Sequence, residues 1–269
     1  MKFPRKFILV FISILFIVSL TGCAKKQEKD LFTKIKERGK IIAGVRYDAR
    51  PFGFVNEDQQ VRGFDIDLCR EIAYRILGNR DAIEFQQVTS SNRIFSITSG
   101  AVDFTAATMT ITPKRAQIID FSNPYYIAGQ AVMVPKDSEI NDISDLAGKR
   151  IIVSLGSTSE MNIRQMFPDA EILGFRTYTD AFSALRAGRG DAMTTDDTII
   201  YGFILENPEF IMLKERFTQE PYGLGFKKGR ETFVLRETID MILEDLARDG
   251  TLTRLKEKWM PDLDNSNNV

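Results

Sequence analysis

The chain has 269 residues, and its 36 lysines and arginines against 37 aspartates and glutamates give a formal net charge of −1. Such a balance gives no support for nucleic-acid binding, which needs a basic surface. The chain contains no histidine, which excludes histidine-based catalytic triads, histidine metal sites and imidazole acid–base chemistry. We expect no metal and no cofactor.

The N-terminus is predicted to be a lipoprotein signal peptide that covers residues 1–22. Three basic residues precede an uncharged run over residues 7–20, which is too short to span a membrane comfortably and suits a signal peptide. The run ends in Leu20-Thr21-Gly22-Cys23, which resembles a bacterial lipobox with Cys23 as the lipidated residue. The alternative is an ordinary signal peptide, or an uncleaved anchor, with a chance cysteine. Residues 23–33 are expected to tether the anchor to the folded body.

Cleavage before Cys23 would remove 22 residues and leave 247, enough for one large or two small domains. Because three of the removed residues are basic, the net charge would fall to about −4. Lipidation of Cys23 would leave Cys69 as the only free cysteine, so no disulfide could form within the chain. Cys69 lies in a helical pattern, where we expect a small core residue.

The body begins with alternating strand and helix patterns. A strand is predicted over residues 41–45, an apolar run. A helix is predicted from Phe64, because apolar residues recur every four positions as far as Ile76, and Gly78 marks its end. A strand, a short helix and another strand follow over residues 83–88, 92–98 and 102–107. This alternation predicts an α/β fold with mostly parallel sheets.

Residues 105–115 are predicted to lead from a strand into a helix. Thr112 is placed to cap this helix, and Pro113 suits its first position. Lys114 and Arg115 then fall in the first turn, where the helix end is partly positive and favours anions. Two cations there, beside threonine hydroxyls and free N–H groups, indicate a carboxylate or phosphate site. The alternative is a solvated helix start.

The second half of the chain repeats the pattern. A strand over residues 150–155 leads to a helix in which Ser157 and Glu160 have the spacing of a capping box. Residues 182–191 then resemble residues 95–103, since in both a short helix ends at glycine and a strand follows an aspartate. The similarity suggests two lobes of like design.

The C-terminal part is expected to return to the first lobe. A strand over residues 222–226 precedes two amphipathic helices over residues 231–248 and 252–260. Crossings between the lobes near residues 128–134 and 219–225 would make a two-stranded hinge with a cleft between the lobes. The crossings divide the chain into lobe 1, residues 34–130 and 221–269, and an inserted lobe 2, residues 131–220.

These motifs, in this order, resemble the extracellular solute-binding proteins of the polar amino acid type, family 3. The resemblance covers roughly residues 34–261 and rests on the motifs GFDIDLCREIA from Gly63, TITPKR from Thr110, DFSNPYY from Asp120, DLAGK from Asp145 and KEKW from Lys256. It implies a two-lobed periplasmic-binding-protein clamshell of type II. With the lipobox, it implies a monomer anchored by lipid outside the cytoplasm. Such a protein captures an amino acid and delivers it to the permease of an ABC importer.

The resemblance assigns ligand contacts to individual residues. Arg115 matches the arginine that pairs with the ligand α-carboxylate, with Thr110 and more loosely Thr108 beside it. Asp196 matches the carboxylate that receives the α-ammonium group; the alternative is a cap for the following helix. The acids of the first motif are expected to be cap and surface residues instead.

The second lobe is expected to contribute a loop that closes over the ligand. Ser154, Ser157 and Thr158 match that loop, although Ser157 could do no more than cap its helix. Tyr222 matches an aromatic residue on the hinge side of the ligand, and Tyr178 is a second candidate of this kind. Packing alone is the alternative for both tyrosines.

The residues expected near the ligand side chain resemble the glutamate/aspartate branch of the family. In the segment T-S-S-N-R-I from Thr89, the resemblance implies that Ser90 and Arg93 reach the ligand. Arg46 occupies a position that is basic in that branch. Ala49 and Ser90 stand where many relatives carry an aromatic pair, so the aromatic sandwich of those relatives is absent.

Charge then predicts the ligand class. Three cations, Arg46, Arg93 and Arg115, would face one carboxylate, Asp196. Because an unpaired buried charge is costly, we expect a ligand with a second carboxylate, glutamate or aspartate, in preference to glutamine. Glutamine or a broader set of polar amino acids is the alternative, and Arg46 or Arg93 could instead be a solvated surface charge.

Two other classes of function compete with a binding protein. A few relatives of this fold dehydrate small cyclic acids, but such chemistry needs a general acid. The matched cleft positions offer no spare acid, so we expect no enzyme. A sensory domain would need a signalling partner, and the chain ends at Val269 without a signalling domain, which counts against that class.

Overall fold

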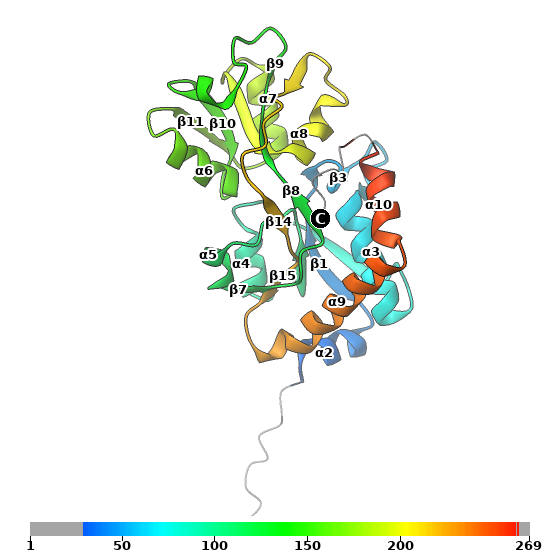
Figure 1. Ribbon diagram of the computed structural model, residues 1–269. Coiled ribbons are helices and arrows are strands. Elements are labelled where there is room, and N and C mark those ends of the chain that lie inside the picture. Colours follow the sequence, from blue (N-terminus) through cyan, green and yellow to red (C-terminus); the bar gives the residue numbers. More distant parts are fainter. Residues whose placement is uncertain (1–28, 262, 264–269) are drawn as a thin grey trace, which may run out of the picture.

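The computed structural model describes residues 29–261 and 263, which form two five-stranded sheets, one above the other in Figure 1. In the lower sheet β1 pairs in parallel with β5 and β6, while β15 runs antiparallel to both β6 and β7. Its strands, in spatial order, are β5 (Ile83–Gln87), β1 (Ile41–Val45), β6 (Phe104–Ala106), β15 (Gly225–Lys227) and β7 (Ile119–Phe121).

The upper sheet has the same plan. β10 pairs in parallel with β11 and β12, and β9 runs antiparallel to both β12 and β13. Four of the five strands in each sheet therefore point the same way, but two of the four strand pairs in each sheet are antiparallel, so the sheets are mixed. The spatial order is β11 (Glu171–Phe175), β10 (Arg150–Ser154), β12 (Ala192–Asp196), β9 (Gln130–Pro135) and β13 (Phe210–Met212).

Two short strands join the sheets. β8 (Tyr126–Ala128) and β14 (Glu220–Tyr222) form an antiparallel pair that lies between the two sheets in Figure 1. The predicted strand over residues 222–226 is wrong in this respect, because the chain leaves the pair at Tyr222 and enters the lower sheet at Gly225. The α/β clamshell is confirmed, and the two-lobe division at residues 130 and 220 is kept as our proposal on this architecture.

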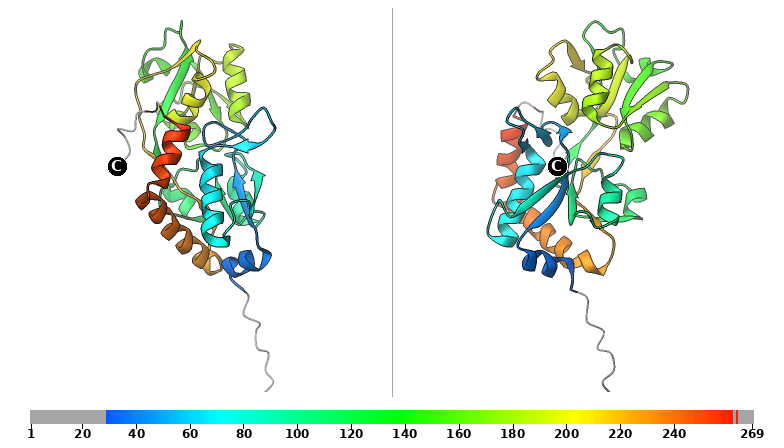
Figure 2. Two further views of the ribbon diagram at one scale, coloured as in Figure 1. Left: turned by 90° about the vertical axis from the view of Figure 1, so that its right-hand side faces the viewer. Right: turned by 180° about the vertical axis from the view of Figure 1, so that it is seen from behind.

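Helices cover both faces of each sheet. In the lower lobe α3, α9 and α10 lie together on one side, and Figure 2 shows α9 and α10 along that side. In the upper lobe, two apolar clusters occupy the two faces of the sheet. The lower-lobe helices are α2 (Leu31–Arg38), α3 (Phe64–Leu77), α4 (Arg93–Thr98), α5 (Pro113–Ala116), α9 (Arg230–Arg248) and α10 (Thr251–Trp259). The upper-lobe helices are η1 (Ile143–Leu146), α6 (Thr158–Met166), α7 (Tyr178–Arg186) and α8 (Asp197–Ile204).

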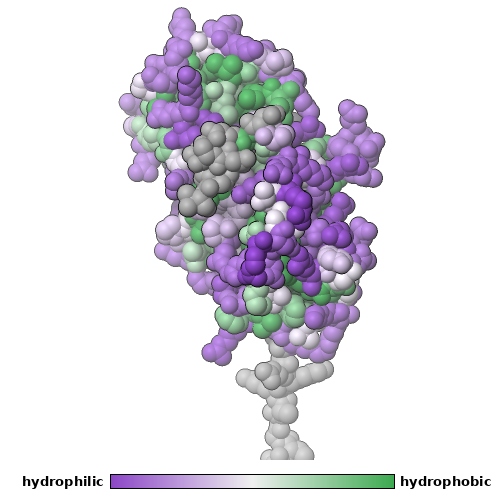
Figure 3. All heavy atoms as spheres, turned by 45° about the vertical axis from the view of Figure 1, so that its right-hand side comes forward, coloured by the Kyte–Doolittle hydropathy of each residue, from purple (hydrophilic) through white to green (hydrophobic). Residues whose placement is uncertain are grey.

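A small three-stranded sheet faces the upper lobe. It consists of β2 (Asp48–Ala49), β3 (Gly53–Val55) and β4 (Val61–Arg62). Hydrophilic residues spread over both lobes on the face seen in Figure 3, with smaller hydrophobic areas between them. Among residues 29–261 and 263, no helix is both long and apolar enough to span a membrane.

The N-terminal prediction needs one correction. The proposed tether over residues 23–33 ends earlier, because helix α2 begins at Leu31 and was not predicted. Asp30 caps this helix by accepting from the Thr33 N–H (2.9 Å), and Gly39 ends it with φ of 68°. The proposed signal peptide and Cys23 lie outside the described residues.

The repeat seen in the sequence corresponds to equivalent positions in the two lobes. Asp103 precedes β6 and accepts from the Ile42 N–H of β1 (2.7 Å). Asp191 precedes β12 and accepts from the Arg150 N–H of β10 (2.8 Å). Each aspartate thus fixes the register of a central parallel strand, which explains why a short helix, a glycine and an aspartate recur.

Candidate functional site

The two lobes touch around the residues predicted to bind ligand. The Arg115 guanidinium of lobe 1 donates to the Gly156 carbonyl of lobe 2 (3.2 Å), and the Tyr178 N–H of lobe 2 donates to Asp48 of lobe 1 (2.7 Å). A Cβ at Gly156 would lie 2.9 Å from the Ser91 Cα, so the two backbones are in close contact. The structure is therefore that of a closed pair of lobes.

Strand ends bring the predicted residues together. The carboxyl ends of parallel strands meet at one edge of a sheet, where α/β folds bind their ligands. Arg46 follows β1 directly, while Ser154 and Asp196 are the last residues of β10 and β12. All eleven predicted residues are buried: Arg46, Ser90, Arg93, Thr108, Thr110, Arg115, Ser154, Ser157, Thr158, Asp196 and Tyr222.

Arg93 is a buried cation with an incomplete set of partners. One of its terminal nitrogens donates to the carbonyls of Ala107 and Thr108, while its Nε has no hydrogen-bond partner. Burial, and then the nearby charge of Arg115, lower the pKa of Arg93 to about 9. Within the described part of the chain Arg93 makes no ion pair, so an anionic group would be well placed beside it.

Arg115 lies in the first turn of α5, as predicted. Thr112 accepts from the Arg115 N–H (3.2 Å), and Pro113 is the first helical residue. The side chain donates to the Thr110 carbonyl (2.8 Å), and burial lowers its pKa. Lys114 is exposed, so the prediction of two cations in one anion site is wrong for Lys114, and for Arg115 it stays a prediction.

Asp196 ends β12 and stands at the N-cap position of α8. Its side chain nevertheless makes no capping hydrogen bond, so the alternative of a simple helix cap is not supported. One carboxylate oxygen, Oδ2, accepts from the Tyr222 hydroxyl, and the other, Oδ1, is buried without a partner. Burial, and then the charge of Glu220, raise the pKa of Asp196 to about 7.

Unpartnered polar atoms are concentrated around this site. Within the described chain the Thr108 and Ser154 hydroxyls join Arg93 Nε and Asp196 Oδ1 in being buried without hydrogen bonds. Thr108 also has a positive φ of 46°, which is uncommon for a residue with a side chain. A buried polar atom without a partner costs about 1–3 kcal/mol. Such a group of donors and acceptors suits a zwitterion.

Two other predicted residues, Ser157 and Thr158, already hydrogen-bond to groups of the protein itself. Ser157 accepts from the Glu160 N–H (3.0 Å) and donates to the Ser154 carbonyl (2.7 Å), which is the capping role given above as the alternative. The predicted capping box is wrong in one detail, because Glu160 reaches back to the Gly156 N–H instead. Thr158 donates to Glu220 (2.9 Å).

The surroundings of Arg46 differ from the prediction. Its Nε and Nη2 donate to the two oxygens of Asp48, each at 2.8 Å, and its Nη1 donates to the Ser90 hydroxyl (2.9 Å). The guanidinium carbon lies 4.4 Å from the centre of the Tyr178 ring. The count of three cations against one carboxylate is therefore wrong, because it left out Asp48 and also Glu220.

The acids of the first motif also need correction. Asp65 is fully buried rather than exposed, and it accepts from the Tyr125 hydroxyl (2.9 Å) and the Thr108 N–H (3.4 Å). Burial raises its pKa to about 7. Asp67 accepts from the indole of Trp259 (2.8 Å) and so ties α3 to α10. Asp65 thus accepts from the backbone N–H of Thr108, the residue with the positive φ.

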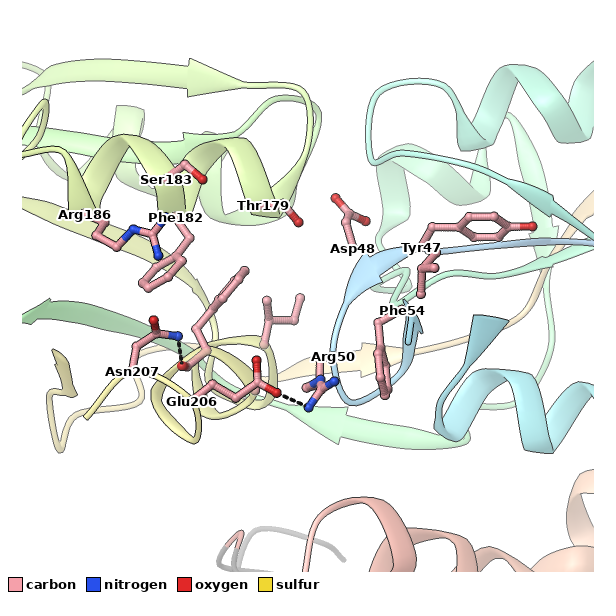
Figure 4. Close-up of a pocket in the computed structure, with 14 residues that line it drawn as sticks. Tyr47, Asp48, Arg50, Phe54, Thr179, Phe182, Ser183, Arg186, Glu206 and Asn207 are labelled. Carbon is pink, nitrogen blue, oxygen red and sulfur yellow. Dashed lines mark hydrogen bonds and ion pairs between the residues drawn. The ribbon is translucent and has the colours of Figure 1, made fainter. Parts of the chain in front are cut away.

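A groove of about 450 Å³ lies between the lobes beside the predicted site. Figure 4 shows Asp48, Arg50 and Phe54 on one wall, facing Phe182 and Glu206 on the other. Arg50 and Glu206 form an ion pair across it. None of its lining residues was predicted to bind ligand, but Asp48 belongs both to this wall and to the Arg46 ion pair.

Comparisons with known proteins agree with this architecture. The sequence pattern of the bacterial extracellular solute-binding proteins, family 3, matches residues 41–262. The chain is 42% identical to a glutamine-binding protein of Geobacillus stearothermophilus, covering 84% of this chain and 93% of that one. It is 38% identical to the ABC transporter glutamine-binding protein GlnH of Bacillus subtilis, covering 94% and 96%.

A solved structure shows the same fold. The cysteine-binding protein of Campylobacter jejuni superposes with a TM-score of 0.82 at 32% identity, covering 86% of this chain and 93% of that chain. Its ligand differs from those of the two relatives above. Side-chain specificity therefore has to be argued from the residues of this chain.

Proposed function

The chain belongs to the bacterial extracellular solute-binding proteins of family 3, and on this basis we propose that it captures glutamine for an amino-acid ABC importer. The family acts outside the cytoplasm. In our proposal Cys23 carries the lipid anchor, and the closed lobes deliver the amino acid to the permease. The protein carries out no chemistry on its ligand.

One observation carries the proposal. Asp196 Oδ1 is buried without a partner, close enough to Arg93 for the charges to interact, and Arg93 and Arg115 lack ion pairs within the described residues. A zwitterion supplies a carboxylate for the two arginines and an ammonium group for Asp196. Thr108 and Ser154, whose hydroxyls are unpartnered, would complete its hydrogen bonds.

The choice of glutamine revises the preference for acidic ligands. Arg46 is paired with Asp48. The site then holds as many carboxylates as guanidinium groups: Asp48, Asp196 and Glu220 against Arg46, Arg93 and Arg115. A second ligand carboxylate would add a buried negative charge without an added cation. The glutamine-binding relatives support the same choice. Glutamate is the second candidate, because Arg93 still has an unpartnered Nε.

Calorimetric titration with the twenty amino acids tests the proposal. We expect glutamine to bind most tightly and glutamate next. Preferred binding of arginine or of an apolar amino acid would contradict the ligand class. Release of a new product during incubation would contradict the absence of chemistry.

A further inference from the structure

We infer that Asp48 sets the choice between an amide and a carboxylate ligand side chain, by compensating the charge of Arg46 in the closed protein. The inference rests on the proposed function, since it concerns the ligand side chain of the same site. Asp48 was not among the residues predicted to bind ligand.

The Asp48–Arg46 pair is complete and buried. Two parallel hydrogen bonds of 2.8 Å join the guanidinium to both carboxylate oxygens, which is the strongest geometry for such a pair. The side chains of Arg46 and Asp48 are 0% and 8% exposed. Little screening by water is available there, so Asp48 determines whether Arg46 acts as a charge or as a neutral set of donors.

The second lobe holds this pair in place. Asp48 Oδ2 also accepts from the N–H of Tyr178, the first residue of α7 (2.7 Å), where a helix end favours an acid. The ring of Tyr178 lies against the guanidinium of Arg46. Both contacts cross between the lobes, so the complete arrangement belongs to the closed protein.

Arg46 also contacts Ser90, which was predicted to reach the ligand. It donates to Ser90 (2.9 Å), and its charge is one of those that lower the pKa of Arg93. An arginine with a paired carboxylate can still donate to an amide oxygen, but it offers no net charge to a second carboxylate. Without Asp48, the same arginine would be a buried, uncompensated cation that favours an anionic ligand.

The test compares the glutamate-to-glutamine ratio of dissociation constants among variants by calorimetry. Asp48→Asn keeps one oxygen that can accept from the Tyr178 N–H, removes the charge, and replaces the other oxygen with an NH₂ group that cannot accept from Arg46. The ratio should therefore fall about tenfold or more in favour of glutamate. Arg46→Gln leaves Asp48 uncompensated, so the ratio should move the opposite way. The double variant should return towards the wild-type ratio.

Asp58→Asn is the matched control. It makes the same change of charge in the same lobe at an exposed side chain, and its ratio should equal that of wild type. If Asp48→Asn does not fold, the ratio of dissociation constants can still be compared between Arg46→Gln and the double variant.

The outcomes separate the two claims. Opposite shifts for Asp48→Asn and Arg46→Gln support the inference. Equal weakening of both ligands in each variant would show that the pair is structural and would overturn the inference, while leaving glutamine capture intact. A wild-type protein that binds neither amino acid would overturn the proposed function, and the inference with it.

Discussion

The Tyr222 hydroxyl donates to Asp196 Oδ2, which joins hinge strand β14 to the end of β12 in the second lobe. Tyr222 is fully buried, with its ring against Phe52 and Tyr126. The hydrogen bond fixes which oxygen of Asp196 is left for a ligand. Tyr222 is therefore a positioning residue in our account, and it need not touch the ligand.

Tyr222→Phe keeps the packing and removes this hydrogen bond. A hydrogen bond to a charged group contributes about 1.5–3 kcal/mol, so we expect glutamine to bind roughly tenfold or more weakly. Calorimetry checks this. Tyr74→Phe, at a residue that is 44% exposed, should bind like wild type, and equal affinity in both variants would contradict the role of Tyr222.

Ligand binding should depend on pH through Asp196. Its pKa is raised to about 7 in the closed protein, and only the ionised carboxylate can form an ion pair with an ammonium group. Affinity should therefore fall as the pH drops from 8 to about 5.5, with proton release on binding. Calorimetry in buffers of different ionisation enthalpy measures both effects. Asp196→Asn should bind weakly with no such proton release; the same release in that variant would point to another group.

Folding stability should depend on pH through Asp65. Its pKa is raised from 3.8 to about 7 by burial, so between these values the folded state holds a proton that the unfolded state releases. The free energy of unfolding should then decrease as the pH rises through this window. Asp65→Asn removes the ionisable group, so its stability should depend less on pH.

Urea unfolding at pH 5 and pH 8 measures this difference for Asp65. Asp58→Asn, an exposed site, serves as the control and should keep the wild-type dependence. An unchanged pH dependence in Asp65→Asn would show that Asp65 is ionised throughout that range.

Gly202→Ala should hinder closure of the lobes. A Cβ at Gly202 of α8 would lie 2.2 Å from the Arg50 carbonyl oxygen in the other lobe, which the closed backbone cannot accommodate. We expect a weaker glutamine complex and a larger radius of gyration with ligand, measured by scattering. Glu206→Gln removes the half-exposed Arg50 ion pair without bulk and should cost less than about 1 kcal/mol. Equal effects of the two variants would contradict the steric explanation.

The sequence predicted the central strands and long helices because their apolar periods are clear. It missed α2, although Asp30 and Gly39 mark the two ends of that helix. It also missed edge strands of three residues such as β7 and β13, since so short a run has no readable period. The return of the chain at residues 222–226 was read as one strand because nothing local shows a change of sheet.

The site was predicted less completely than the fold. Asp48 could have been anticipated, because residues two apart in extended backbone share a face, and Arg46 lies two positions before it. Asp65 could not, since its burial depends on tertiary contacts with Tyr125 and Thr108. The sequence does not show whether Ser157 caps its own helix or binds ligand, because a capping hydroxyl and a ligand hydroxyl have the same sequence pattern.

The most direct test of the account compares glutamine with glutaramic acid, which lacks the α-ammonium group, on wild type and Asp196→Asn. Removing one partner of a buried charge pair costs about 2–5 kcal/mol, so calorimetry should show wild type binding glutamine at least thirtyfold more tightly than the analogue, on the order of 2 kcal/mol. Asp196→Asn should lose most of that difference. If wild type binds both compounds equally, or if the difference survives in Asp196→Asn, then Asp196 does not receive the ammonium group and the account is contradicted.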